Sequence, residues 1–96
     1  MTLTTVVNIR YQEYDEYCGR AGHGQSGYFG NPFPIAAGES RESCIQKFRS
    51  YFYKRLESDP EFKCRVHTLK GKRLGCFCAP KACHCDIIAE YVNNLD

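Results

Sequence analysis

Two segments that favour β-strands enclose a helical stretch, and this order limits the folds open to the chain. Residues 4–10 are β-branched or apolar over most of their length, as expected for a strand buried on both faces, and residues 72–78 form a second such segment. Between them, apolar side chains recur at helical spacing from Ile45 to Leu56. We therefore expect an α/β fold, a small Rossmann-like sandwich with a mainly parallel sheet of three or four strands and two main helices.

The remaining elements follow from local signals. At 96 residues the chain has the size of one domain. Ser40 is a good N-cap for the main helix, and Asp59 followed by Pro60 predicts that a second, short helix begins where the first one ends. The expected strands are therefore residues 4–10, 16–20 and 72–78, and the expected helices begin at Ser40, at Pro60 and near Cys83.

A long loop separates the first strands from the main helix. Residues 19–38 contain six of the eight glycines and two of the four prolines, which excludes regular structure there. Within it, Asn31 can hydrogen-bond an amide or a base edge, and Phe33 can stack on a flat ring. The alternative is that Phe33 packs on the core while Asn31 forms a turn with Pro32. The composition of this loop, with glycines beside aromatic side chains, is typical of the rim of a binding pocket.

The carboxyl ends of the predicted strands carry basic side chains. Arg10 and Arg20 each end a strand, and loops at the carboxyl ends of parallel strands meet in one crevice. Two guanidinium groups so close repel each other unless an anion lies between them or carboxylates such as Asp15 and Asp86 pair with them. The sequence therefore predicts that Arg10 and Arg20 bind an anionic ligand.

Four of the seven cysteines lie within residues 76–85. Zinc sites more often use two C-x₂₋₄-C pairs separated by 12 to 20 residues. Cys76 would point with Cys78 to one face of a strand, whereas Cys83 and Cys85 would diverge at a helix start. We therefore expect no metal and no cofactor, and we expect Cys76 to pack as a small apolar side chain.

The start of the last helix is the other candidate site. Unpaired backbone N–H groups and a partial positive charge favour an anion near Cys83 and His84, and Lys81 adds a cation just before them. Asp86 would belong to the same site or would simply complete the helix cap. Cys83 could also act as a nucleophile with His84 as its partner, but adjacent residues do not normally face each other, so we favour a binding protein over an enzyme.

The net charge and the composition limit the kinds of partner and the cell compartment expected for the chain. The net charge is +2, yet residues 41–81 hold eleven basic and four acidic side chains, which indicates either a polyanion-binding surface or the solvated face of a helix. No long apolar segment and no basic leader are visible, so we expect a cytoplasmic protein without membrane contact and with reduced thiols. A chain of this size is compatible with a homo-oligomer.

The motifs of the chain resemble a small family of phage and bacterial proteins known only as a domain of unknown function. The resemblance rests on residues 7–10 (VNIR), on Gly19–Arg20, on residues 30–33 (GNPF) and on the cysteine-rich residues 76–86, and it covers nearly the whole chain. Cys85 stands where the family usually has glycine. The resemblance implies a Rossmann-like fold and a gene carried by phage genomes. The protein itself is then expected in the cytoplasm of a bacterial host.

The preferred interpretation is a protein that binds and sequesters a nucleotide-like anionic small molecule. A cyclic-nucleotide or NAD-derived immune signal of the host would be such a ligand. The candidate binding residues are Arg10, Arg20, Asn31, Phe33, Lys81, Cys83, His84 and Asp86. The alternatives are an enzyme acting on nucleotides or nucleosides through Cys83, His84 or Asp86, and a zinc-stabilised module that binds nucleic acid or protein, of which nucleic acid is the less favoured partner.

Overall fold

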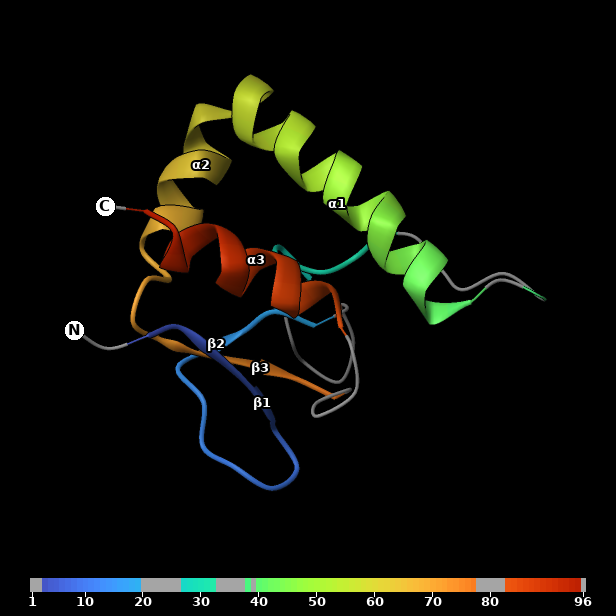
Figure 1. Ribbon diagram of the computed structural model, residues 1–96. Coiled ribbons are helices and arrows are strands. Elements are labelled where there is room, and N and C mark those ends of the chain that lie inside the picture. Colours follow the sequence, from blue (N-terminus) through green and yellow to red (C-terminus); the bar gives the residue numbers. More distant parts are fainter. Residues whose placement is uncertain (1–2, 20–26, 33–37, 39, 78–82, 96) are drawn as a thin grey trace.

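The computed structural model describes residues 3–19, 27–32, 38, 40–77 and 83–95. These residues form a three-stranded parallel sheet and three helices, which confirms the α/β fold. In Figure 1 the helices lie together on one side of the sheet. In chain order the elements are β1 (Thr5–Asn8), β2 (Glu16–Tyr17), α1 (Arg41–Ser58), α2 (Pro60–His67), β3 (Arg73–Cys76) and α3 (His84–Asn93).

The sheet has the strand order β1-β3-β2, with β3 parallel to both neighbours. The prediction that the first strand is buried on both faces is wrong, because in β1 only Val7 is buried and Thr5 is exposed. In the part of the chain that the structure describes, β1 is an edge strand of this sheet and pairs with a neighbour on one side only. The buried strand is β3, in which Leu74, Gly75 and Cys76 are all buried.

The connection from β1 to β2 crosses the face of β3 that the helices do not cover. Parallel strands are usually joined by a dozen or more residues, often a helix, but here residues 9–15 suffice. The backbone N–H of Asp15 donates to the Arg73 carbonyl at 2.9 Å, which fixes the end of this loop against β3. A Cβ at Gly75 would lie 2.5 Å from Ile9 Cγ2 and 2.8 Å from Tyr14 Cγ. The loop therefore packs directly on a glycine.

The helices begin and end where their capping residues predict. Ser40 Oγ accepts the backbone N–H of Ser43 at 3.0 Å at the start of α1. Asp59 caps α2 by accepting the N–H of Phe62 at 3.1 Å, with Pro60 in the first turn. The buried side chains of α1 recur every four residues and form one face toward the core: Cys44, Phe48, Phe52 and Leu56.

The end of α3 is tied to the start of β1. The Thr4 backbone N–H donates to Asn93 Oδ1 at 2.8 Å, and Asn93 Nδ2 donates to the Thr4 carbonyl at 2.9 Å. The Thr4 hydroxyl donates to the Leu69 carbonyl and accepts the N–H of Gly71. These bonds hold α3 along the sheet, with Ile88 and Val92 in the core. Among the described residues no helix is both long and apolar enough to span a bilayer.

Gly75→Ala tests the crossing of the loop over β3. The added methyl group would overlap Ile9 Cγ2, so we expect a loss of about 1–3 kcal/mol in the free energy of unfolding, measured by urea denaturation. Ile9→Ala removes the closer of the two overlapping groups and leaves the Tyr14 ring, so the same substitution should cost less, but still destabilise, in an Ile9→Ala background. Equal costs in the two backgrounds would show that Ile9 does not press on this position.

Candidate functional site

The carboxyl ends of β1 and β3 carry a cation beside two aromatic rings, one exposed and one half-buried. Asn8 Nδ2 donates to the Phe77 carbonyl at 3.2 Å, which joins the two strand ends. The guanidinium of Arg10 lies over the Phe77 ring, 5.5 Å from its centroid. Tyr17 meets the same ring edge-on at 6.1 Å, and Phe77 is 42% exposed. We call Arg10, Tyr17 and Phe77 the carboxyl edge. Arg10 lies in the turn two residues beyond the end of β1, so the predicted strand 4–10 is too long at this end, and ligand binding by Arg10 stays a prediction.

A cluster of three buried thiols lies behind this edge. The Sγ atoms of Cys76, Cys83 and Cys85 lie within 4.8 Å of one another. Cys76 points toward α3 because side chains alternate along β3, and Leu74 shares its core-facing side. The expectation that the helix-start cysteines diverge from Cys76 is wrong. Cys83 precedes α3 with extended backbone angles (φ −147°, ψ 154°), and this conformation turns its side chain toward Cys76 and Cys85.

His84 lies among these thiols and is only 8% exposed. Its Nε2 donates to the Cys18 carbonyl at 2.6 Å, because a carbonyl can only accept. Its Nδ1 is 3.6 Å from Cys83 Sγ, and Nε2 is 3.6 Å from Cys85 Sγ. The expectation that Cys83 and His84 do not face each other is therefore wrong, since the extended backbone of Cys83 folds its thiol back onto the ring.

The environment of the thiols disfavours their charged form. The neighbouring Cys76 thiol, together with burial, raises the pKa of Cys83 well above its ordinary value. The thiols of Cys18, Cys76 and Cys83, and then burial, raise the pKa of Cys85 in the same way. Each of these thiols is protonated at neutral pH unless a positive charge is added. A protonated thiol is a weak nucleophile, so this arrangement favours binding over covalent catalysis.

Asp86 closes the first turn of α3. Its Oδ2 accepts the backbone N–H of Cys83 at 3.0 Å, while its own N–H donates to the Cys83 carbonyl at 3.0 Å. The interpretation of Asp86 as part of the helix cap is confirmed. Its carboxylate occupies the place where an external anion would meet the Cys83 amide. Any anion held near this helix end must therefore rely on other donors.

The structure brings Asn31 and His84 to the same side of α1. Asn31 is 5% exposed, and its Nδ2 donates to Cys44 Sγ at 3.4 Å. One turn further along α1, the ring of Phe48 contacts the His84 ring at 5.0 Å between centroids. Asn31 and His84 therefore pack against neighbouring turns of the same face of α1, while the prediction that they line a common anion-binding hollow stays a prediction. The other predicted binding residues, Arg20, Phe33 and Lys81, lie outside the described residues.

Several arginines of the basic middle segment form ion pairs with acidic residues. The described pairs are Arg49–Glu90, Arg55–Asp59, Arg65–Glu61, Arg73–Glu13 and Arg73–Asp15. These contacts support the interpretation of this segment as solvated helix surface rather than as a polyanion-binding patch. Asp15 accepts from the guanidinium of Arg73 through both carboxylate oxygens, at 3.1 Å each, so it does not serve as the expected partner of Arg10.

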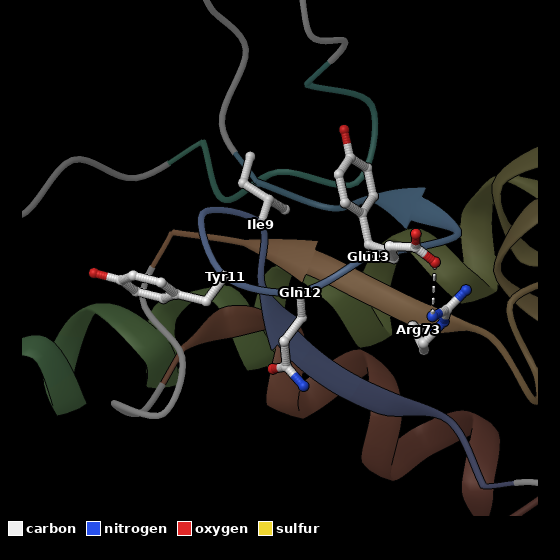
Figure 2. Close-up of a pocket in the computed structure, with 6 residues that line it drawn as sticks. Ile9, Tyr11, Gln12, Glu13 and Arg73 are labelled. Carbon is white, nitrogen blue, oxygen red and sulfur yellow. Dashed lines mark ion pairs between the residues drawn. The ribbon is translucent and has the colours of Figure 1, made fainter.

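A pocket of about 460 Å³ lies on the loop that crosses the sheet (Figure 2). Its lining residues are Ile9, Tyr11, Gln12, Glu13, Tyr14 and Arg73. Glu13 and Asp15 both form ion pairs with the Arg73 guanidinium. Their negative charges offset the charge of Arg73, the only cation among these lining residues. The pocket therefore offers little attraction to an anion, and Arg10 at the carboxyl edge is the better placed donor.

Sequence reasoning missed three features of this region. It did not single out Tyr17 or Phe77, and it treated Cys76 as core packing apart from Cys83. A signal was available, because a helix that follows a strand across a short loop begins beside the end of that strand. Residues on the core-facing side of the strand end and in the first helical turn then become neighbours. Applied to Cys76 and Cys83, that rule predicts their contact.

Comparison with known proteins places the chain in a family. A model described as a domain of unknown function (DUF4326) matches residues 3–94. The chain is 46% identical over 68 residues to the "Uncharacterized 12.4 kDa protein in nrdA-td intergenic region" of Enterobacteria phage T4. The match covers 71% of this chain and 62% of the phage protein, so the chain spans less than two thirds of that relative. No solved structure is significantly similar. The resemblance expected from the motifs is confirmed.

Asp15→Asn should change the acid sensitivity of the fold. The hydrogen bonds from Arg73 lower the pKa of Asp15 from 3.8 to about 2. Since the folded-state pKa is depressed, the stabilisation is present above the ordinary pKa and is lost as the pH falls from about 4 to about 2. We expect urea midpoints of Asp15→Asn to vary less with pH in this window. Glu13→Gln, 4.0 Å from Arg73, is the control and should keep the full pH dependence.

Asp86→Ala should weaken the start of α3. Loss of the cap leaves the Cys83 N–H without its carboxylate partner, and we expect a cost of about 1 kcal/mol in unfolding free energy. Glu90→Ala on the same helix removes only a surface ion pair with Arg49 and should cost about 0.5 kcal/mol or less. Thermal or urea denaturation of both variants measures the difference. Equal effects of the two substitutions would contradict the capping role.

Proposed function

The chain belongs to the DUF4326 family of domains of unknown function, and from this premise we propose that it binds a nucleotide-derived anionic small molecule at the carboxyl edge. In this proposal the protein sequesters its ligand and releases it unchanged. Arg10 meets a phosphate group of the ligand, and the Phe77 ring offers a surface on which a base stacks. The observation that carries the proposal is the Arg10 guanidinium over the exposed Phe77 ring.

The position of this pair supports the proposal. Ligands of open parallel α/β sheets bind outside the carboxyl ends of the strands. Phe77 directly follows β3, and Arg10 lies two residues after the end of β1. Guanidinium groups form charge-assisted hydrogen bonds with phosphates, and aromatic faces stack on bases regardless of their identity. α3 begins beside the same end of β3, as the contact of Cys83 with Cys76 requires, so the positive end of its dipole faces this region.

The chemistry of the neighbouring groups supports binding without turnover. Cys83 is a buried thiol with a raised pKa, His84 is held by the Cys18 carbonyl, and Asp86 caps α3. Each group considered for catalysis thus already serves the fold. An enzyme acting on nucleotides would need one of them freed toward the ligand.

The similarity to a phage protein supports a setting for such a binder. A cyclic-nucleotide or NAD-derived alarm signal of the host is small, anionic and built around a base, as the carboxyl edge requires. A protein that keeps such a signal bound lowers its free concentration by mass action, without any reaction. We therefore propose immune evasion by sequestration as the biological role.

Calorimetric titration with cyclic di-AMP, cyclic ADP-ribose and ADP-ribose tests this function. We expect micromolar or tighter binding of at least one compound. Arg10→Ala should weaken it about tenfold or more, the loss expected for a charged hydrogen bond. The control is Arg65→Ala on α2, which Figure 1 places away from the start of α3; it should leave the affinity unchanged.

Two results would contradict the proposal. Absence of heat with all three compounds would remove the nucleotide class, and equal affinities of Arg10→Ala and the unmodified chain would remove the carboxyl edge as the site. Mass spectrometry of the ligand after heat denaturation separates a binder from an enzyme. The binder returns the compound unchanged, whereas a new product would identify an enzyme.

A further inference from the structure

The three clustered thiols have no part in the proposed nucleotide site. Buried cysteines commonly pack singly as small apolar groups. Here the Sγ atoms of Cys76, Cys83 and Cys85 instead lie within 4.8 Å of one another. They come from the end of β3 and the start of α3. Four thiolates around zinc at about 2.3 Å are separated by about 3.8 Å from one another, so small side-chain shifts bring these three into ligand positions.

A fourth donor lies next to the cluster. Cys18 is fully buried, and its thiol is close enough to the Cys85 thiol to raise the pKa of Cys85, although it is not one of the three whose Sγ atoms lie within 4.8 Å of one another. The Cys85 thiol also donates to the Cys18 carbonyl at 3.4 Å. His84 is the other nearby donor: its Nε2 donates to that same carbonyl at 2.6 Å, and its Nδ1 lies 3.6 Å from Cys83 Sγ. We take the thiol of Cys18 as the fourth ligand, because it gives the all-thiolate set of a common structural zinc site.

The electrostatic setting suits a cation bound by thiolates. Cys83 precedes the first residue of α3 and Cys85 lies in its first turn, so both sulfur atoms are close to the positive end of the helix dipole. That end favours thiolates, whereas burial and the mutual contact of the thiols oppose them. A divalent cation at the centre of the cluster removes this opposition, because each thiol releases its proton to solvent as the metal binds.

We propose that Cys76, Cys83 and Cys85 bind a zinc ion and that Cys18 supplies the fourth ligand. The site is closed and structural, because all four residues are buried. It fastens the end of β3 to the start of α3 and the segment after β2 to both. The irregular spacing of the ligands along the chain does not prevent this, since the parallel sheet brings the ends of β2 and β3 together.

Metal analysis of the full chain, purified under reducing conditions from cells grown with added zinc, is the first test. We expect about one zinc ion per chain. Cobalt(II) added to the metal-free chain should give a thiolate-to-cobalt charge-transfer band, with the intense visible bands of tetrahedral coordination, and zinc should displace it. Wild-type protein with neither stoichiometric zinc nor such a band would overturn the proposal.

Single substitutions assign the ligands. Cys76→Ser, Cys83→Ser and Cys85→Ser should each lose most of the bound zinc, and Cys18→Ser should weaken binding strongly. Cys64→Ser, at an exposed cysteine of α2, is the matched control and should keep zinc at the wild-type level. Undiminished zinc in the cluster variants would overturn the site, and undiminished zinc in Cys18→Ser would overturn the fourth ligand.

Three further measurements separate zinc binding from misfolding of variants, from disulfide formation and from the proposed function. Cobalt titration of the reduced wild-type chain needs no variant, so a variant that fails to fold does not decide the outcome. Intact mass after purification without reductant detects a disulfide as the loss of a hydrogen pair; a disulfide within the cluster that forms in place of zinc binding would overturn the proposal. Arg10→Ala should keep its zinc whatever its nucleotide affinity, so the two sites fail separately.

Discussion

The position of β3 between two parallel strands is the constraint on which the rest of the molecule depends. Parallel pairing places the carboxyl ends of all three strands at one edge, where Arg10 and Phe77 meet. It also leaves β1 and β2 without contact in the sheet, so the loop between them must pass over β3. That passage requires a residue without a side chain, and Gly75 supplies it.

The start of α3 shows how one backbone conformation serves several purposes. The extended Cys83 receives the carboxylate of Asp86 on its N–H and turns its thiol toward Cys76 and the ring of His84. The cap and the thiol cluster are thus two results of the same geometry. Two sources of positive charge lie at this end of the molecule. The positive end of the helix dipole faces the thiols, and the Arg10 guanidinium faces solvent.

The fold could be predicted from the sequence because its signals are local. Ser40, Asp59 and Pro60 set the helix boundaries through contacts within a few residues. The apolar repeat of α1 follows from helical geometry alone. The burial of β1 was misjudged because strand composition does not tell which strand lies at an edge. That is decided by pairing with residues 73–76, far along the chain.

The candidate site was harder to predict for the same reason. Arg10 was identified because the end of a strand is visible in the sequence. The thiol cluster was missed because its distances depend on a turn between β3 and α3 and on the backbone angles of Cys83. Spacing rules derived from known zinc motifs describe ligands on hairpins and helices. They do not describe a strand end facing a helix start.

The reliance of β1 and β2 on a partner more than fifty residues later affects the order in which the chain can fold. As the chain leaves the ribosome amino end first, both strands emerge without anything to pair with, while α1 and α2 can already form from local contacts. The sheet is therefore completed only after α1 and α2 have emerged, when residues 73–76 pair with both strands. Until then the edges of both are open to any other extended segment nearby, including those of a second copy.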